Sequence, residues 1–227
     1  MHHSLSVELA TLARELHSDL DVTETVETIL QHTPTITGCS QASIMLGDER
    51  PRQVASATDA RAERADRYQL QLGEGPAVAV MSRHEPVVVR DIPADPRWSR
   101  WTSEAARMGL RGVLSVRLGT ERTTLGALTL YSSESGWFGP DHVASANLCA
   151  RLASVAVAST QRISVLRRAV DDRTVIGQAQ GVLQARHGID AERAFTMLLA
   201  YARTHRIEVS DAAEAVVSGR VAPGGYR

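Results

Sequence analysis

The sequence of 227 residues contains no lysine, and it has only two cysteines and 4% aromatic residues. Cys39 and Cys149 are too few for a disulfide framework or for a complete cysteine zinc site. No run of eighteen apolar residues could form a membrane span, and the N-terminus has no apolar signal-peptide core. We therefore expect a soluble, cytoplasmic protein.

The motifs of common catalytic sites are also absent. The sequence has no P-loop, no dinucleotide-binding glycine fingerprint, no H-E-x-x-H and no G-x-S-x-G. Its eight histidines share no metal-ligand spacing. We therefore expect a protein that is not an enzyme and that carries no metal ion or cofactor.

The charge is divided unevenly along the chain, although the net charge is only -1. Residues 161–227 contain ten arginines and seven acidic residues, whereas residues 1–160 contain fifteen basic and nineteen acidic residues. A basic C-terminal part on an acidic body fits a nucleic-acid-binding protein. Ordinary variation between domains is the alternative explanation.

The first 160 residues predict an α+β fold. Residues 5–32 have the spacing of an amphipathic helix, which restarts at Asp21. From Gln41 the apolar period changes to two, which predicts strands separated by short helices. The strands are expected at 42–46, 53–57, 87–89, 112–118 and 124–131, and the helices at 59–68, 77–83 and 98–108. This order predicts an antiparallel sheet of five or six strands with helices on both sides.

A long helix is expected from Asp141, because neither proline nor glycine occurs between this residue and Ile176. Residues 141–172 form a connecting helix with nearly heptad apolar spacing. The seam consists of Leu148, Leu152, Ala156, Ser159, Ile163, Leu166 and Val170. We expect Leu148, Leu152, Ile163, Leu166 and Val170 to pair with a second chain, so that the protein is a homodimer. The alternative is a helix that packs only on its own sheet.

Residues 173–220 predict a small three-helix bundle. The first helix has an apolar face and ends at Gly188, a favourable C-terminal cap. Asp190 caps a second helix over residues 191–205. Ser210 or Asp211 caps a third helix, and Phe195 is among the residues expected in the core.

The bundle sequence resembles the ANTAR family from about Arg173 to Val217. The residues that carry the resemblance are I-x-Q-A-x-G-x-L from Ile176, then H-G-I, A-F-x-x-L, Y-A and A-E-A-V-V. The resemblance implies a three-helix RNA-binding module of bacterial transcription antiterminators. Gln180 stands where the family often has a basic residue, so RNA binding is expected to depend on arginines elsewhere. Gln184 stands where a methionine is frequent.

The candidate RNA-binding residues are polar or glycine and lie on the expected helix surfaces. Arginine can contact phosphate, glutamine can read a base edge, and tyrosine can stack on an unpaired base. Gly181 leaves room for a close approach of RNA, or else for close packing of another helix. Tyr201 is expected either in the RNA site or in the core. The candidates are Arg173, Gln178, Gln180, Gly181, Arg186, Tyr201, Arg203 and Arg206.

Residues 20–160 resemble the GAF family, and with the N-terminal helix they form a domain over residues 1–160. The carrying segments are L-G-E-G-P from Leu72, V-V-V-R-D from Val87, G-L-R-G-V-L-S-V-R-L from Gly109, L-G-A-L-T-L-Y from Leu125 and F-G-P-D from Phe138. The resemblance implies a sensor of a small molecule or of redox state, although the fold does not name the ligand.

A ligand pocket of this GAF-like domain is expected between the sheet and the inserted helices. Trp98 and Trp101 lie three residues apart beside a loop, and we expect these two to touch a ligand. Core packing is the alternative for every lining residue. The candidates are Leu72, Val78, Met81, Val89, Trp98, Trp101, Met108 and Leu114.

Together these features predict a bacterial transcription antitermination regulator that binds tandem stem-loops in nascent RNA and responds to an unidentified small-molecule or redox signal. A DNA-binding regulator is the first alternative, because three-helix bundles also present recognition helices. A GAF-type redox enzyme or chromophore protein is the second. Neither cysteine lies in a motif typical of that second group, so we expect both to be buried structural thiols.

Overall fold

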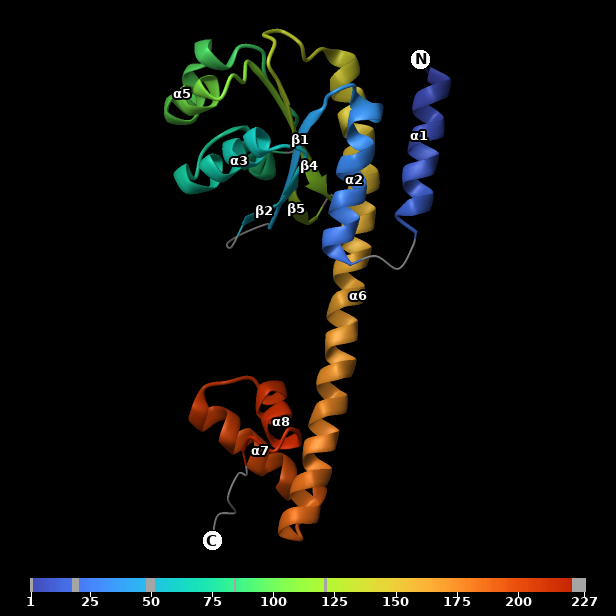
Figure 1. Cartoon of the computed structure of the whole chain (residues 1–227), viewed down its shortest axis with the longest axis vertical. Helices are drawn as coiled ribbons and strands as arrows, with labels where there is room; N and C mark the ends of the chain where they lie inside the picture. Colours follow the sequence, from blue (N-terminus) through green and yellow to red (C-terminus); the bar gives the residue numbers. More distant parts are fainter. Residues whose placement is uncertain (1, 18–20, 48–51, 84, 121, 222–227) are drawn as a thin grey trace. The chain divides into compact units, whose positions relative to one another are not determined.

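A computed structural model describes residues 2–17, 21–47, 52–83, 85–120 and 122–221 (Figure 1). The chain divides into two compact units, Met1–Gln161 and Arg162–Arg227. We call them the sheet unit and the bundle unit and describe each by itself.

The sheet unit is built on five antiparallel strands in the order β2-β1-β5-β4-β3. The strands are β1 (Gln41–Leu46), β2 (Gln53–Ala57), β3 (Val87–Val89), β4 (Gly112–Gly119) and β5 (Thr124–Ser132). The long strand β5 lies in the middle and pairs with β1 and β4. The predicted α+β class and the antiparallel sheet are therefore confirmed.

Helices cover both faces of this sheet (Figure 1). Helix α2 (Val22–Thr37) and the first part of α6 (Pro140–His187) cover one face, and α1 (His2–Glu15) lies along α2. The other face carries α3 (Ala60–Leu72), α4 (Pro76–Ser82), two short 3-10 turns (Ile92–Ala94 and Pro96–Trp98) and α5 (Ser99–Arg107). Alternate strand residues enter the two cores, because successive side chains of a strand point to opposite faces.

The N-terminal region forms two helices, so the single helix expected over residues 5–32 is wrong. The side chain of Asp21 accepts a hydrogen bond from the Glu24 amide at 2.8 Å, and Glu24 accepts one from the Asp21 amide at 2.8 Å. This capping box starts α2 afresh. Residues 18–20 of the predicted helix lie outside the described residues. Helix α2 then continues through Pro34 and ends at Gly38, whose φ is 74°.

Helix α6 is continuous for 48 residues and supplies side chains to both units. The predicted connecting helix over residues 141–172 and the first helix of the bundle are therefore one helix, and neither Gly177 nor Gly181 interrupts it. By length and composition α6 could cross a membrane, but 44% of its apolar window is buried inside the protein. Packing against the sheet accounts for that apolar character, so the membrane evidence is weak.

The bundle unit combines the last part of α6 with α7 (Ala191–His205) and α8 (Val209–Val217). Asp190 caps α7 as expected, because its carboxylate accepts a hydrogen bond from the Arg193 amide at 2.8 Å. The predicted cap of α8 is wrong: the helix begins at Val209, after Glu208, with no side-chain cap. Phe195 was expected in the core, but its exposed fraction is 38% because Ala194 and Leu198 occupy the inward side of α7.

Gly126 of β5 provides a test of the sheet register. A Cβ atom at this position would lie 1.9 Å from the Met45 carbonyl oxygen of β1, and backbone cannot move aside cheaply. We expect Gly126→Ala to lower the free energy of unfolding by about 3 kcal/mol or more in denaturant titrations. Gly139→Ala is the control, because its Cβ would meet only His142 Nδ1 at 3.9 Å. Equal stability of the two variants would contradict this register.

Candidate nucleic-acid interface and sensor core

Three predicted RNA-binding residues on α6 are exposed arginine or glutamine side chains. They are Arg173, Gln178 and Arg186. Gly181 on the same helix is also exposed, and a Cβ atom added there would meet nothing within 4 Å. Close packing of another helix of the same chain is therefore not the reason for this glycine.

Gln180 and Tyr201 are engaged within the bundle. The Gln180 Nε2 group donates a hydrogen bond to the Ala191 carbonyl oxygen at 3.0 Å and so joins α6 to the first turn of α7. The ring of half-buried Tyr201 stacks on His205 with their centroids 3.9 Å apart, and it packs against the bundle core. Both side chains are thus held by contacts within the bundle. Tyr201 contacts the bundle core and also the exposed His205.

The end of α7 presents Arg203 and Arg206, both exposed. Arg206 ends the helix in the left-handed conformation with a φ of 55°, which a side chain adopts at a cost of about 1 kcal/mol. Across the described ranges, no ion pair or side-chain hydrogen bond engages Arg173, Arg186, Arg203 or Arg206. Their guanidinium groups are therefore available to phosphate groups.

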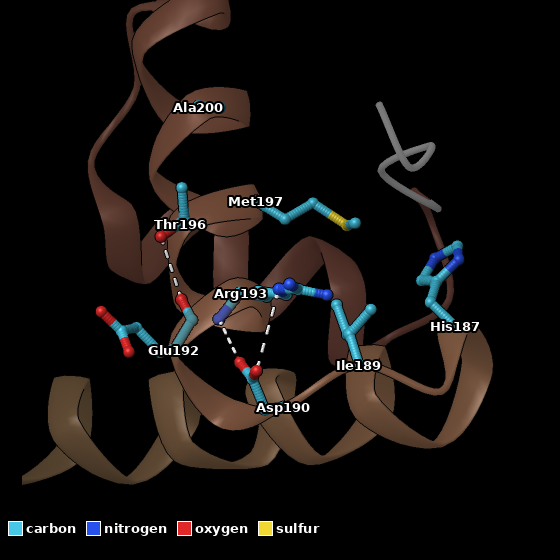
Figure 2. Close-up of a pocket in the computed structure, with 8 residues that line it drawn as sticks. All are labelled: His187, Ile189, Asp190, Glu192, Arg193, Thr196, Met197 and Ala200. Carbon is cyan, nitrogen blue, oxygen red and sulfur yellow. Dashed lines mark hydrogen bonds and ion pairs between the residues drawn. The ribbon is translucent and has the colours of Figure 1, made fainter. Parts of the chain in front are cut away.

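A hollow of about 830 Å³ lies beside the turn between α6 and α7 (Figure 2). Two acidic residues, Asp190 and Glu192, and one arginine, Arg193, lie in its wall, and the Arg193 Nε atom lies 3.8 Å from the Asp190 carboxylate. Mixed charge of this kind does not favour a polyanion. The hollow contains none of the predicted RNA-binding residues, and its lining is His187, Ile189, Asp190, Glu192, Arg193, Thr196, Met197 and Ala200.

Most of the predicted ligand-pocket residues lie on the sheet face that α3, α4 and α5 cover, but they are packed. Trp101 is fully buried, and its Nε1 donates a hydrogen bond to the Ala65 carbonyl oxygen at 3.0 Å. Val89 is buried in the same cluster, and Leu72, Trp98 and Met108 pack against it. Met81 belongs to the neighbouring cluster under α4, and Val78 is half-buried on that helix.

Leu114 was placed in the predicted pocket incorrectly. It packs in the cluster of α2 and α6, on the opposite face of the sheet. The preceding residue, Val113, points toward α5 instead. Because strand residues alternate between faces, a shift of one position moves the side chain to the other core.

The sequence analysis missed a buried polar network on the sheet face that α3, α4 and α5 cover. The fully buried Asp66 carboxylate accepts hydrogen bonds from the Ser43 hydroxyl at 2.6 Å, the Tyr131 hydroxyl at 2.5 Å and the Gln69 Nε2 group at 2.8 Å. Burial raises the pKa of Asp66 from the ordinary 3.8 to about 6. The available signal was the spacing of Ala62, Asp66 and Gln69 on one helix face.

The network explains the L-G-E-G-P segment. Gln69 Oε1 accepts a hydrogen bond from the Ala77 amide at 2.7 Å, which fixes the first turn of α4. Gly75 has a φ of 133°, and a Cβ atom there would lie 2.4 Å from Gln69 Oε1. Glycine is needed because the backbone must cross directly over this amide.

The two cysteines are free and buried. The Cys39 thiol donates a hydrogen bond to the Tyr131 carbonyl oxygen at 3.0 Å, and burial raises the pKa of Cys149 to about 11. A high pKa disfavours the reactive thiolate. Among the residues that the structure describes, no group of three His, Cys, Asp or Glu side chains could hold a metal ion.

Comparison with known families identifies both units. The GAF domain model matches residues 19–158, and the ANTAR domain model matches residues 164–217. The chain therefore belongs to the GAF domain family and carries an ANTAR domain after it, as the sequence predicted. No curated protein matched the sequence.

Solved structures share the fold at low sequence identity. The GAF domain of a phosphoenolpyruvate-protein phosphotransferase from Coxiella burnetii is 17% identical with a TM-score of 0.56, and the match covers 72% of this chain and 98% of that chain. The corresponding Acinetobacter domain is 14% identical with a TM-score of 0.54, covering 70% and 96%. The photosensory core module of a Stigmatella aurantiaca phytochrome is 13% identical with a TM-score of 0.58, covering 85% and 43%.

These two domains define the general class of the protein. ANTAR domains are RNA-binding modules of antitermination regulators, and GAF domains are sensors. Both are regulatory domains and neither is a catalytic domain.

Replacing the buried carboxylate by an amide tests the network around Asp66. Because the folded state raises this pKa, it binds the proton more tightly than the unfolded state does, and the free energy of unfolding falls as pH rises from about 4 to about 6. The loss is roughly 3 kcal/mol. We expect Asp66→Asn to remove this dependence and to be more stable than the natural protein at pH 7.5, as measured by denaturant titration.

Glu85→Gln is the control for charge removal, because this carboxylate is exposed on the same unit. It should leave the pH profile of stability unchanged. An Asp66→Asn protein that keeps the same dependence between pH 4 and pH 6 would show that Asp66 is not its source.

Proposed function

We propose that the protein is a cytoplasmic, dimeric transcription antitermination regulator whose bundle unit binds tandem hairpin loops in nascent RNA. The match of residues 164–217 to the ANTAR domain carries this proposal. Binding of the hairpins prevents formation of an intrinsic terminator. The sheet unit responds to a small-molecule or redox signal and thereby controls RNA binding.

The exposed polar surface of the bundle unit supports RNA binding. Arg173 and Arg186 extend from α6, and Arg203 and Arg206 extend from the end of α7. Unpaired arginines suit phosphate contacts and can also stack on bases. Gln178 on α6 supplies an amide that can read the edge of an unpaired base.

Self-association is supported by apolar side chains on α6 that the chain itself leaves exposed. Ile163, Leu166 and Val170 have exposed fractions of 41%, 66% and 64%, and Leu148 has 42%. Leu152 is half-buried against the core of the sheet unit. Pairing of these residues would bring two bundle units together, and two linked sites bind tandem hairpins more tightly through effective concentration.

The sheet unit would act on the bundle unit through α6, which is continuous between them. A signal molecule changes the arrangement of the dimer only if it binds two alternative arrangements with different affinity. A small molecule that bound in the packed core around Trp101 and Val89 would have to change the side-chain packing there. The signal is therefore expected to change RNA affinity or oligomeric state.

Substitution of two arginines tests the RNA surface. We expect Arg173→Ala and Arg203→Ala each to weaken binding of a tandem-hairpin RNA about tenfold, since each removes a charge-assisted contact. Each variant should also reduce the slope of log affinity against log salt by about one. Fluorescence anisotropy at several salt concentrations gives both quantities, and Arg100→Ala on the sheet unit is the control.

Competitors separate RNA binding from DNA binding. Excess duplex DNA should not displace the hairpin RNA, whereas an RNA with replaced loop sequences should bind poorly. Displacement by duplex DNA would favour a DNA-binding regulator, and absence of RNA binding at low salt with or without cell extract would contradict the proposal.

A further inference from the structure

The ring of His32 on α2 lies between two carboxylates of α1, the helix that runs along α2 (Figure 1). Its Nδ1 atom is 2.7 Å from Glu8 Oε1, and its Nε2 atom is 2.8 Å from Glu15 Oε2. Glu8 and Glu15 are about two helical turns apart and therefore lie on one face of α1. A single side chain of α2 thus bridges two turns of α1. We call this contact the His32 bridge.

The geometry of the His32 bridge requires a charged ring. An ionised carboxylate offers only acceptors, so each ring nitrogen has to supply a proton. Neutral imidazole carries one N–H group, whereas imidazolium carries two. A glutamate does not hold the second proton, because the ordinary pKa of a glutamate, about 4.3, lies well below that of histidine, about 6.5.

The His32 bridge is partly sheltered from water. The exposed fraction of the side chain is 13% for His32, 25% for Glu8 and 46% for Glu15. Burial alone would lower the pKa of His32, but the hydrogen bonds and charges of Glu15 and Glu8 outweigh burial and raise it. These two glutamates are the charged groups that act on the ring. The positions one turn away on α2 carry no ionisable side chain and are Thr28, Ile29, Thr35 and Ile36.

The apolar contact that holds α1 in place is small. Leu12 is fully buried, and Leu9 and Leu16 pack partly buried against the same core. Val7 of the same helix has an exposed fraction of 54%. A helix of 14 residues is marginal in water on its own, so α1 depends on its contacts with the rest of the sheet unit. Loss of the His32 bridge therefore weakens both the docking and the helical structure of α1.

Helix α2 passes the effect of this contact to the first part of α6. The hydroxyl groups of Thr25 on α2 and Thr160 on α6 form a buried hydrogen bond of 3.2 Å. Thr33, next to His32, lies with its hydroxyl 3.8 Å from the Cys149 thiol of α6. The state of the His32 bridge thus acts on the helix pair that covers one face of the sheet.

We propose that the His32 bridge is a pH-sensitive switch for α1, which is docked on α2 while the ring carries two protons and is released when the ring loses one. The proton passes to water, and no covalent bond of the chain other than that N–H bond changes. The nitrogen lone pair then faces a carboxylate oxygen with no proton between two acceptors. The inference does not depend on the proposed binding of RNA.

The direction of the pH dependence follows from the raised pKa of His32. The docked state binds the proton more tightly than the released state, so docking is fully stabilised below the ordinary pKa of 6.5. This stabilisation is lost as the pH rises through the higher pKa of the docked state. The dependence that Asp66 causes is complete by about pH 6, so the two groups act in different pH ranges.

Hydrogen–deuterium exchange of the full chain, followed by mass spectrometry, measures the docking of α1. Samples are compared at about pH 6 and about pH 8.5, on either side of the ordinary histidine range, after correction for the intrinsic exchange rate. We expect protection of the α1 amides to fall roughly tenfold at the higher pH, since one charge-assisted hydrogen bond is lost. Protection of α2 should stay unchanged, because its own capping box and core contacts remain.

The variant Glu8→Gln distinguishes a switch from a merely structural contact. Its amide can donate to the ring nitrogen that has lost the proton, while the remaining N–H donates to Glu15. We therefore expect Glu8→Gln to keep α1 protected at both pH values, whereas His32→Ala should leave α1 poorly protected at both. Glu27→Gln is the control for charge removal, because this carboxylate is exposed on α2. It should keep the pH dependence of the natural protein.

Three outcomes would overturn the switch. The first is equal protection of α1 at the two pH values in the natural protein, whether high or low. The second is a Glu8→Gln protein that loses protection at the higher pH as the natural protein does. The third comes from NMR titration of the histidine rings: the midpoint for His32 should be higher in the natural protein than in Glu8→Gln, and equal midpoints would show that Glu8 does not hold the proton on the ring.

Discussion

The uninterrupted helix α6 is the constraint on which the rest of the structure depends. This helix of 48 residues packs in the core of the sheet unit through Ala146, Cys149, Ala153 and Val157. It packs in the core of the bundle unit through Ala179 and Leu183. Small side chains dominate these contacts, which lets strands and helices approach α6 closely. The exposed part of the helix carries charged side chains such as Arg168 and Asp172 together with the aliphatic side chains of Ile163, Leu166 and Val170.

The sheet unit has a sensor fold with a filled core. Trp101, Val89 and Tyr131 occupy the sheet face where a GAF-type ligand site is expected. Asp66 adds a buried carboxylate to this face, and its hydrogen-bond partners are all uncharged. Holding this carboxylate away from water costs free energy that three donors only partly offset. A buried group in this position ties β1, β5, α3 and the start of α4 together, so any occupant of the core must act on the same four elements.

The overall fold was predictable because its signals are local and periodic. Alternating residues marked the strands, Gly188 and Asp190 marked the turn between α6 and α7, and recognisable segments marked both families. The failures involve relations that a local pattern does not contain. Leu114 was assigned to the wrong face because the strand period fixes the alternation of side chains but does not say which face is which. The apolar spacing restarted at Asp21, but it did not reveal that a capping box with Glu24 begins a separate helix there. Phe195 illustrates the same limit, since alanines can fill a small bundle core without it.

The candidate site was predictable only in part, because glycine, glutamine and arginine on a helix have several possible partners. Exposure removes one possibility for Gly181, since no residue of the described part of the chain packs there, and Gln180 is already engaged with α7. Glycine weakens an exposed helix relative to alanine, and packing within the described part of the chain gives no reason for glycine at this position. Arg173 and Arg186 are exposed on the same helix, and guanidinium groups of this kind suit contacts with a polyanion.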